Sequence, residues 1–388
     1  MTIYGNRIDT TSEEEDFNND KLVLLHTLWR HGERSPIYLF PKKHNHDSGG
    51  LDDEEDWLNG LGELTMNGLI QHYKLGRRLR HKYIKKIPFL SKIYDPNEVH
   101  IRSTKTHRTI QSARANMVGM FGNVKKYKVK EDPLFEQIQV EIIPEKINQL
   151  MHNLNACPRR VELWEYLVRT PEFQRYLNYY KNLFNELSKY AGEEVTYKHL
   201  LYEMEDLLRI EVENGYNLTR EEKVFEEQVF EANHKIYRFM NGLGLSTYEG
   251  IKFDEEIPKT GSGKLLWDII GNMQEKVNCL LNNTALEECE SVLKKKYFVF
   301  SGHDSTISSL FAAFGFKHTD FNLDGFPMHA SCITIELWMK PDKSTYIRAY
   351  YLRRHTPSIE ITYDITGCEN GCSLDSYVKH QFSRDKMK

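Results

Sequence analysis

The chain has 388 residues, which is enough for one elaborated α/β unit or two closely joined domains with a sizeable buried core. Its 40% hydrophobic and 28% charged residues are typical of a folded protein and exclude wholesale disorder. The formal net charge of -4 gives no general attraction to nucleic acid or anionic membranes, so recognition of an anion would need a local cluster of arginines.

The N-terminus and the longest apolar run bear on where the chain resides. Residues 1–20 are polar and acidic, the opposite of a secretory signal, so we expect a flexible segment there and no export signal in the chain as given. This leaves the compartment open. No apolar run approaches the roughly 20 residues that cross a bilayer. Residues 22–29 therefore predict a buried strand, and no transmembrane segment is expected.

Three parts of the chain share one order of elements: an apolar run typical of a strand, a loop with basic or polar residues, and a helical pattern. The strands and their loops are predicted at residues 22–29 with 30–36, 99–101 with 102–104, and 297–300 with 301–304. Because the loops after the carboxyl ends of strands form the ligand crevice of an open α/β sheet, we expect these three loops to converge.

The middle and the end of the chain follow other patterns. Residues 142–273 carry apolar residues at helical spacing, which predicts a helical insertion or cap. Residues 332–338 and 346–352 alternate around a turn, which predicts a hairpin that closes the sheet. The predicted class is α/β, with a mainly parallel central sheet flanked by helices and a smaller helical cap domain. Its parts are a sheet domain at residues 21–141 and 274–376, the cap at residues 142–273, and a C-terminal tail at residues 377–388.

The most informative string is the loop at residues 30–36, Arg-His-Gly-Glu-Arg-Ser-Pro. Arg30 and Arg34 flank His31, and Gly32 lets the backbone turn tightly enough for these side chains to face one point. Guanidinium forks bind phosphoryl oxygens through paired hydrogen bonds and stabilise the charge that develops during transfer. A neutral imidazole whose other nitrogen is held by a backbone carbonyl can attack phosphorus. The string predicts a phosphate site with His31 as nucleophile, and its place after a buried strand argues against a mere basic surface turn.

The other two loops supply the remaining candidates. Arg102 follows the second strand and would add the third guanidinium that a phosphate site without a metal ion needs, with Arg108 further along the predicted helix. Asp304 would protonate the leaving oxygen and then take a proton from water, while His303 donates a hydrogen bond to the phosphate. The alternatives are that Arg102 starts a solvated helix and that Asp304 only caps one.

Cysteines and metal ligands form no clear pattern. The six cysteines are too few and too scattered for a disulfide scaffold, and three bridges or none are both compatible with the sequence. Cys368 and Cys372 enclose a compact turn, where a local disulfide is favoured over zinc because no second cysteine pair lies nearby. The loop with His44, His46 and Asp47 lacks a zinc-type pattern. We therefore predict no metal site and no cofactor.

Four stretches together resemble the histidine acid phosphatases, branch 2 of the histidine phosphatase superfamily. They are residues 30–36, 62–76, 101–113 and 303–304. The resemblance extends over residues 21–373 and is nearer to the prostatic and lysosomal acid phosphatases than to the phytases. It implies an α/β domain with a smaller helical one, and hydrolysis of phosphate monoesters through a phosphohistidine intermediate. The site residues that it implies are His31 as nucleophile, Asp304 as proton donor, and Arg30, Arg34, Arg102 and His303 around the phosphate.

The resemblance also bears on partners, compartment and disulfides. It implies a small phosphomonoester as substrate and no nucleic acid, leaves a homodimer open, and points to a secreted or lysosomal protein. Cys157 and Cys332 resemble family cysteines, as does the Cys368/Cys372 pair. The usual partner of Cys332 is missing near Ile210, however, and the chain stops before the expected partner of Cys157, so two of the family's bridges lack a partner.

Two rival functions remain open at this point. A phosphoglycerate-mutase-like phosphotransferase also begins its site with Arg-His-Gly-Glu, although Arg34, Asp304 and the helical insertion argue against it. A non-catalytic relative that only binds phosphorylated ligands is the other rival, although every catalytic role has a candidate residue here. Transfer without release of phosphate would favour the first, and binding without turnover would favour the second.

Overall fold

The computed structural model describes most of the chain. The described residues are 19–40, 60–144, 157–199, 203–213, 215, 218, 220–281, 287–321, 325–354 and 356–386. Of the predicted flexible segment at residues 1–20, residues 1–18 lie outside the described residues. The loop with His44 and His46 also lies outside them.

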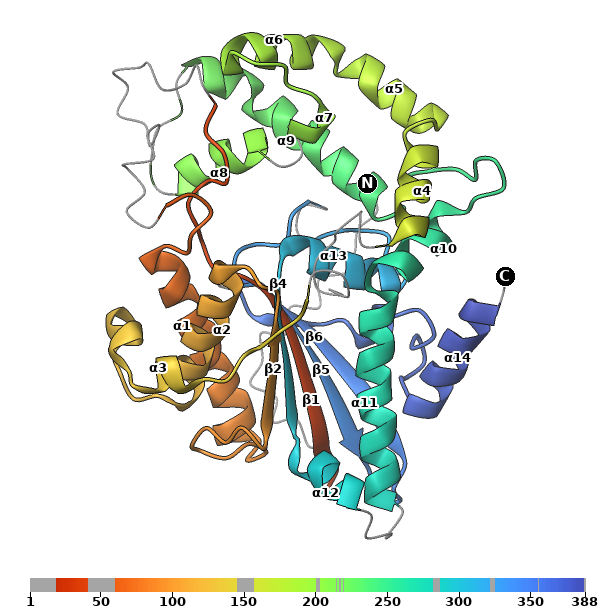
Figure 1. The fold of residues 1–388 in the computed structure, drawn as a ribbon. Helices are drawn as coiled ribbons and strands as arrows, with labels where there is room; N and C mark the ends of the chain where they lie inside the picture. Colours follow the sequence, from red (N-terminus) through yellow and green to blue (C-terminus); the bar gives the residue numbers. More distant parts are fainter. Residues whose placement is uncertain are drawn as a thin grey trace.

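The strands of the described chain form one seven-stranded sheet in the order β3-β2-β4-β1-β5-β6-β7 (Figure 1). They are β1 (Lys21–Arg30), β2 (Val99–Ser103), β3 (Glu141–Ile142), β4 (Tyr297–Gly302), β5 (Cys332–Met339), β6 (Thr345–Leu352) and β7 (Ser358–Glu360). The pairs from β3 to β1 are parallel, whereas β5 pairs with β1 and β6 in antiparallel fashion. The α/β class and the β5–β6 hairpin are confirmed, and the hairpin makes the sheet mixed.

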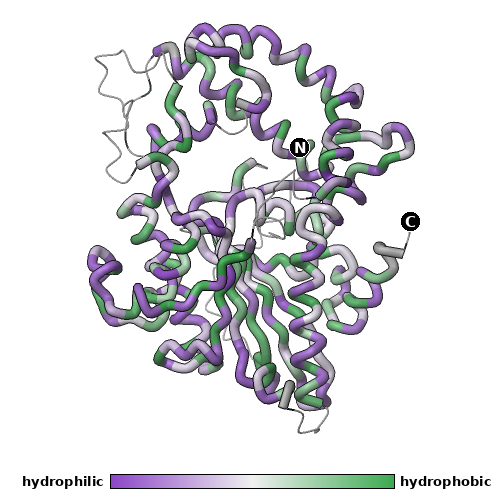
Figure 2. Tube along the Cα trace, in the orientation of Figure 1, coloured by the Kyte–Doolittle hydropathy of each residue, from purple (hydrophilic) through white to green (hydrophobic). Residues whose placement is uncertain are grey.

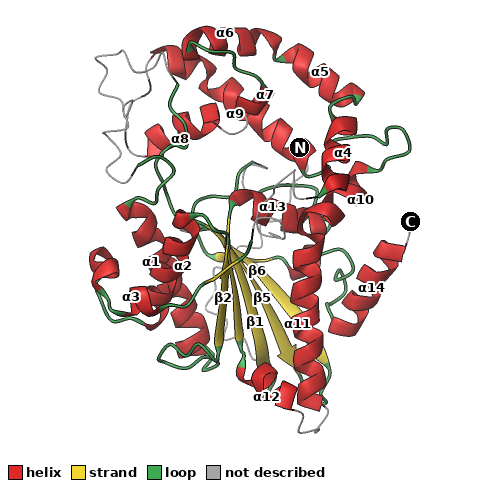
Figure 3. Cartoon of the chain, viewed as in Figure 1, coloured by secondary structure: helices red, strands yellow, loops and turns green. Residues whose placement is uncertain are grey.

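Helices surround the sheet and form a separate layer over one of its ends (Figure 3). Those next to the sheet are α1 (Met66–Arg80), α2 (His107–Phe121), α3 (Leu134–Gln137), α11 (Lys264–Leu281), α12 (Glu287–Lys294), α13 (Asp304–Ala313) and α14 (Leu374–Lys386). The separate layer holds α4 (Pro158–Leu167), α5 (Pro171–Tyr179), α6 (Lys181–Ala191), α7 (Tyr197–His199), α8 (Glu205–Glu213), α9 (Arg220–Met240) and α10 (Phe253–Pro258).

Both faces of the sheet are buried, which explains why β1 is apolar almost throughout. Its alternate residues enter two different cores: Leu25 and Trp29 pack with α1 and α2, and Leu24 and Leu28 pack with α11 and α13. Figure 2 shows the hydrophobic residues running along the strands. Helices cover both faces of β1, so the residues that follow its carboxyl end are the first that this part of the sheet can present to a ligand.

The helical layer has a core of its own, built from residues of α4 to α10 such as Phe173, Leu208 and Phe225. Helix α11 differs, because Leu265, Ile269 and other residues of its first turns pack in the core against the sheet. We propose that α4–α10 form the predicted cap and that α11 belongs to the sheet domain. No helix in the described part of the chain has the length and apolar character needed to cross a bilayer.

The C-terminal helix and the disulfides extend the sheet domain. Tyr377 and Val378 of α14 are buried in the core beside α11, so packing continues past residue 376, where we expected a tail. The predicted Cys368–Cys372 disulfide is confirmed, and a second one joins Cys279 of α11 to Cys289 of α12, which the sequence did not indicate. Cys157 and Cys332 are free.

Buried neutral histidines make the stability of this fold depend on pH. His26 of β1 is 1% exposed and stacks on Phe298 and Phe300, and burial lowers its pKa from 6.5 to about 3. Below about pH 6.5 the unfolded chain binds a proton that the folded chain excludes down to about pH 3. This contribution to stability is therefore complete above pH 6.5 and is lost as the pH falls.

We expect His26→Phe to reduce that pH dependence. Between pH 7 and pH 5, the free energy of unfolding should fall by about 2 kcal/mol more in the wild type than in the variant, at about 1.36 kcal/mol per unit below pH 6.5. Urea unfolding at both pH values measures this difference, with the exposed His81 changed to Phe as the control. An equal fall in the wild type and His26→Phe would contradict the prediction.

Candidate active site

Strand register brings the predicted loops to one edge of the sheet. Arg30, the last residue of β1, pairs with Gly302 at the end of β4, and β2 lies on the other side of β4. The next residues along the chain therefore enter the same space, His31 from β1 and His303 from β4. Their ring centroids are 5.4 Å apart.

His31 is held with one ring nitrogen bonded and the other free to react. Its Nδ1 donates to the carbonyl oxygen of Gly32 at 2.8 Å, as we expected for a backbone carbonyl of this loop, so Nε2 carries the lone pair of the neutral ring. Burial, then the positive charges of Arg108 and Arg30, lower the pKa of His31 well below its usual value. The ring therefore stays neutral in acid solution.

Gly32 allows a close approach between this loop and the start of α1. A Cβ atom at residue 32 would lie 2.4 Å from the carbonyl oxygen of Gly68. A Cβ atom at residue 68 would in turn lie 2.1 Å from the carbonyl oxygen of Glu33. Two glycines thus fix the loop against α1, and any side chain at either position would displace His31.

Asp304 lies beside the first arginine of the loop. Arg30 is 1% exposed, and its Nη2 lies 3.0 Å from Oδ2 of Asp304, which keeps 23% of its side chain exposed. The Nη1 of Arg30 donates to the carbonyl oxygen of Pro327 at 2.7 Å. Burial alone would raise the pKa of Asp304, but the charge of Arg30 outweighs it and holds this pKa below its usual range. Without a ligand Asp304 is therefore ionised.

Arg34 makes a bidentate pair with a carboxylate from the helical layer. Its two terminal nitrogens donate to Oδ2 and Oδ1 of Asp206 at 2.7 and 2.8 Å, and both side chains are buried. Burial would raise the pKa of Asp206, but Arg34 and Arg209 hold it below the usual value. Since a phosphoryl group presents two oxygens with similar geometry, the fork of Arg34 is already arranged for such an anion.

His303 is buried and neutral at the start of α13. Burial, then the charge of Arg108, lower its pKa to about 3. Its side chain accepts a hydrogen bond from the backbone N–H of Thr306, and its Nε2 lies 3.1 Å from Oγ1 of Thr104. The accepting nitrogen carries no proton, so Nε2 is the protonated nitrogen, which can donate to an anion.

The structure places Arg102 away from this group. Its Nη1 lies 3.5 Å from Asp268 of α11 and its Nε lies 3.8 Å from Glu141 of β3. The alternation of β2 explains this, because Val99 and Ile101 face α1 and α2 while Arg102 points to the opposite face. This corrects the prediction that Arg102 supplies the third guanidinium.

Arg108 takes the place that we assigned to Arg102. Of the neighbouring charges, that of Arg108 contributes most to lowering the pKa of both His31 and His303. Burial and the nearby Arg34 lower the pKa of Arg108 itself to about 9, so it remains charged in neutral or acid solution. Its Nη1 donates to the carbonyl oxygen of Gly62 at 3.2 Å.

Sequence reasoning missed the charged residues that α8 brings to the site. Asp206, Arg209 and Glu213 lie on one side of this helix, and Glu213 contacts His329, which precedes β5. The hydrogen-bonded pair of Arg34 and Asp206 is separated by 172 residues, so proximity in the sequence gives no indication of it. Charges spaced three and four residues apart in a buried helix were the signal that could have identified them.

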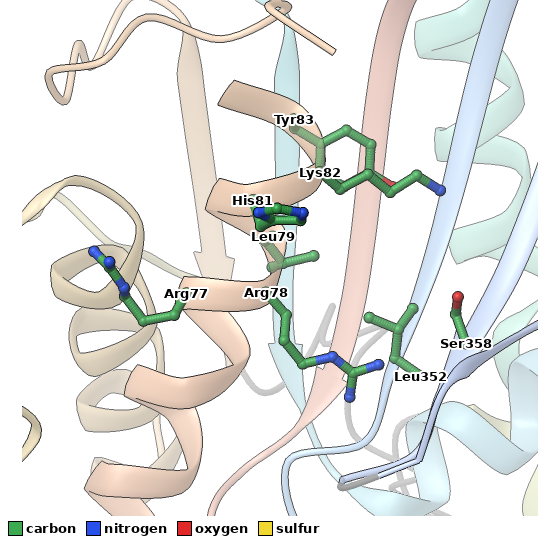
Figure 4. A pocket seen from close by; sticks show the side chains of 8 residues that line it. All are labelled: Arg77, Arg78, Leu79, His81, Lys82, Tyr83, Leu352 and Ser358. Atoms are coloured by element: carbon green, nitrogen blue, oxygen red, sulfur yellow. The ribbon is translucent and has the colours of Figure 1, made fainter. Parts of the chain in front are cut away.

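Another pocket lies on the flank of the sheet. It has a volume of about 370 Å³ and lies between the end of α1 and the strands β6 and β7 (Figure 4). Its lining residues include Arg77, Arg78, His81 and Lys82 and none of the predicted site residues. In the described residues, no group of three or more His, Cys, Asp or Glu side chains could hold a metal ion.

The edge of this α/β sheet gathers an imidazole with a free nitrogen, arginine forks and a carboxyl group. This combination is typical of an enzyme that acts on phosphoryl groups. The chain belongs to the histidine phosphatase superfamily (branch 2), whose family model matches residues 21–352. Relatives of this chain are named acid phosphatases, which are phosphoric monoester hydrolases. The chain is an enzyme of that class.

Individual relatives agree with this assignment. Prostatic acid phosphatase of Homo sapiens is 27% identical over 368 residues, which cover 92% of this chain and 84% of the relative. Lysosomal acid phosphatase of Homo sapiens is 27% identical over 354 residues, covering 91% and 75%. The solved structure of the phytase from Citrobacter braakii shares the fold, with a TM-score of 0.63 at 15% identity, over 94% of this chain and 98% of the phytase.

Arg108 and Arg102 should differ in their contribution to phosphate binding. We expect Arg108→Gln to raise the Kd for inorganic phosphate about 10- to 100-fold, because a charge-assisted hydrogen bond contributes about 1.5–3 kcal/mol. Arg102→Gln should leave the Kd within about twofold, since surface ion pairs contribute little. Calorimetric titration measures both, and a larger loss from Arg102→Gln would reverse the assignment.

Proposed function

We propose that this protein is an acid phosphatase that hydrolyses phosphate monoesters through a phosphohistidine intermediate on His31. The observation that supports the proposal is the fixed tautomer of His31, whose Nδ1 donates to Gly32 and whose Nε2 therefore keeps the lone pair that an attack on phosphorus needs. The charges of Arg108, Arg30 and Arg34, which act on this ring, would supply the positive charge that a phosphoryl group requires.

The substrate would enter by replacing carboxylates at the guanidinium groups. In the resting site, Arg34 binds Asp206 and Arg30 lies against Asp304. The phosphoryl oxygens would take over these donors, together with Arg108 and the Nε2 of His303. This exchange would need little rearrangement of Arg30 and Arg34, because both already extend towards a carboxylate.

Substrate binding would also give Asp304 the proton that it needs as an acid. Its low pKa depends on the positive charge of Arg30, and a bound phosphoryl dianion would neutralise that charge. The pKa of Asp304 would then rise, so the carboxyl group could carry a proton in mildly acid solution. The same ion pair that keeps the empty site ionised thus prepares the acid once the substrate is present.

Hydrolysis would proceed in two displacements. In the first, Nε2 of His31 forms a bond to phosphorus, the ester P–O bond breaks, and the leaving oxygen takes the proton of Asp304. In the second, Asp304 takes a proton from water, the water oxygen bonds to phosphorus, and the bond to His31 breaks. Phosphate then leaves, and the enzyme returns to its first state.

Removal of the nucleophile should abolish turnover. We expect His31→Ala to lower kcat for p-nitrophenyl phosphate by at least about 10³-fold, since Glu33 and Ser35, the other potential nucleophiles of the loop, are engaged in hydrogen bonds with Asn67 and Gly60. The assay is run at acid pH with a chelator present, and circular dichroism checks that the variant is folded. A variant that is folded and retains a tenth of the activity would exclude His31 as nucleophile.

Loss of the acid should depend on the leaving group. Asp304→Asn should lower kcat for an alkyl phosphate about 10²- to 10⁴-fold, because an alkoxide needs a proton as it departs. For p-nitrophenyl phosphate, whose leaving group is stable as an anion, the loss in the first step should be much smaller. Single-turnover kinetics with both substrates measure that step, and equal losses would remove the acid role from Asp304.

A further inference from the structure

A third histidine lies on the side of His31 opposite His303. The strand order β4-β1-β5 places the segment before β5 on that side, and His329 belongs to this segment. The ring centroids of His31 and His329 are 5.7 Å apart. The backbone N–H of Ala330 donates to the carbonyl oxygen of His31 at 3.1 Å, which fixes the two histidines relative to each other.

Helix α8 orients the ring of His329 through Glu213. Nδ1 of His329 lies 3.1 Å from Oε2 of Glu213 and donates to it, and Arg209 lies 3.7 Å from the other oxygen of Glu213. Burial would raise the pKa of Glu213, but His329 and Arg209 hold it below the usual value, so the carboxylate is ionised. The donated hydrogen bond fixes the tautomer, as it does for His31, and leaves Nε2 without a proton.

The Nε2 of His329 is buried without a hydrogen-bond partner among the described residues. The rest of the side chain is fully buried as well. A buried polar atom without a partner costs about 1–3 kcal/mol, so its retention beside a catalytic site needs a reason. A carboxylate that orients an imidazole whose other nitrogen is free is an arrangement suited to accept a proton.

We propose that His329 is a further substrate-contacting residue, which takes the proton of a singly protonated phosphoryl group through Nε2. This inference rests on the proposed phosphatase function. The O–H bond of the phosphoryl group breaks as an N–H bond forms on Nε2, so the group becomes a dianion and His329 becomes an imidazolium. The imidazolium then lies between two anions, Glu213 and the phosphoryl group, and no proton from solution is needed.

The surrounding charges favour this transfer only when the substrate is bound. The groups that face His329 are Arg30 and His31 from the end of β1, and Arg209 and Glu213 from α8. In the empty site, burial and the charge of Arg30 lower the pKa of His329 to about 3. A bound dianion neutralises Arg30, and Glu213 stabilises the imidazolium. A phosphate monoester, whose second pKa is about 6, brings the required proton with it in acid solution.

Two anions of similar shape test the inference. At pH 5 inorganic phosphate carries a transferable proton, whereas sulfate carries none, so binding of sulfate would require a proton from solution. We expect the wild type to take up about one more proton per bound sulfate than His329→Gln does. Calorimetric titration in two buffers of different ionisation enthalpy measures this uptake, and any uptake by Asp304 is common to both proteins.

The variants separate this role from a structural one. Glu213→Gln keeps a hydrogen-bonding side chain but removes the charge, and it should lower the proton uptake with sulfate in the same direction as His329→Gln. His100→Gln, on β2 with its side chain beside Glu141, is the matched control and should equal the wild type. Affinity for phosphate should fall at least about tenfold in His329→Gln.

Each result has one meaning. Equal proton uptake by the wild type and by both site variants would overturn the role of His329, even if p-nitrophenyl phosphate is turned over normally. Absence of turnover by the wild type would instead contradict the proposed function. If His329→Gln does not fold, as judged by its thermal transition, Glu213→Gln alone decides, because an unchanged uptake in that variant would equally overturn the inference.

Discussion

The parallel pairing of β1 with β4 is the constraint on which the site depends. It aligns Arg30 with Gly302 at one edge of the sheet, so that His31 and His303 follow at the same level. Burial of both faces of β1 fixes this register, because a shift by one residue would exchange the residues packed on the two faces. The adjacent antiparallel strand β5 then brings His329 to the same edge.

The site combines neutral imidazoles with charged groups that neutralise one another. Burial and the arginines keep the pKa values of His31 and His303 low, so both rings remain uncharged in acid. Asp206 and Asp304 balance the arginines until an anion replaces them. Buried ion pairs of this kind contribute little net stability, but they hold the guanidinium groups in position for a ligand. The helical layer contributes directly to this balance, since Asp206 belongs to α8.

Much of the fold and part of the site follow from the sequence. Apolar runs at residues 22–29 and 297–300 predicted the strands β1 and β4. The polar loops that follow these strands indicated His31 and Asp304 as candidate site residues. The error at Arg102 arose because loop position was considered without the alternation of β2, which turns this side chain towards α11. The contacts that α8 makes with the site, and the disulfide of α11 with α12, depend on tertiary packing between segments that no local pattern relates.

The central claim is that a phosphoryl group is transferred to His31, and trapping of the intermediate tests it most directly. Brief reaction with an excess of p-nitrophenyl phosphate, an alkaline quench and mass spectrometry of the peptides would locate the bound phosphate. The account predicts an acid-labile, alkali-stable phosphate on Nε2 of His31, because this nitrogen carries the lone pair. Phosphate bound to another residue under the same conditions would contradict it.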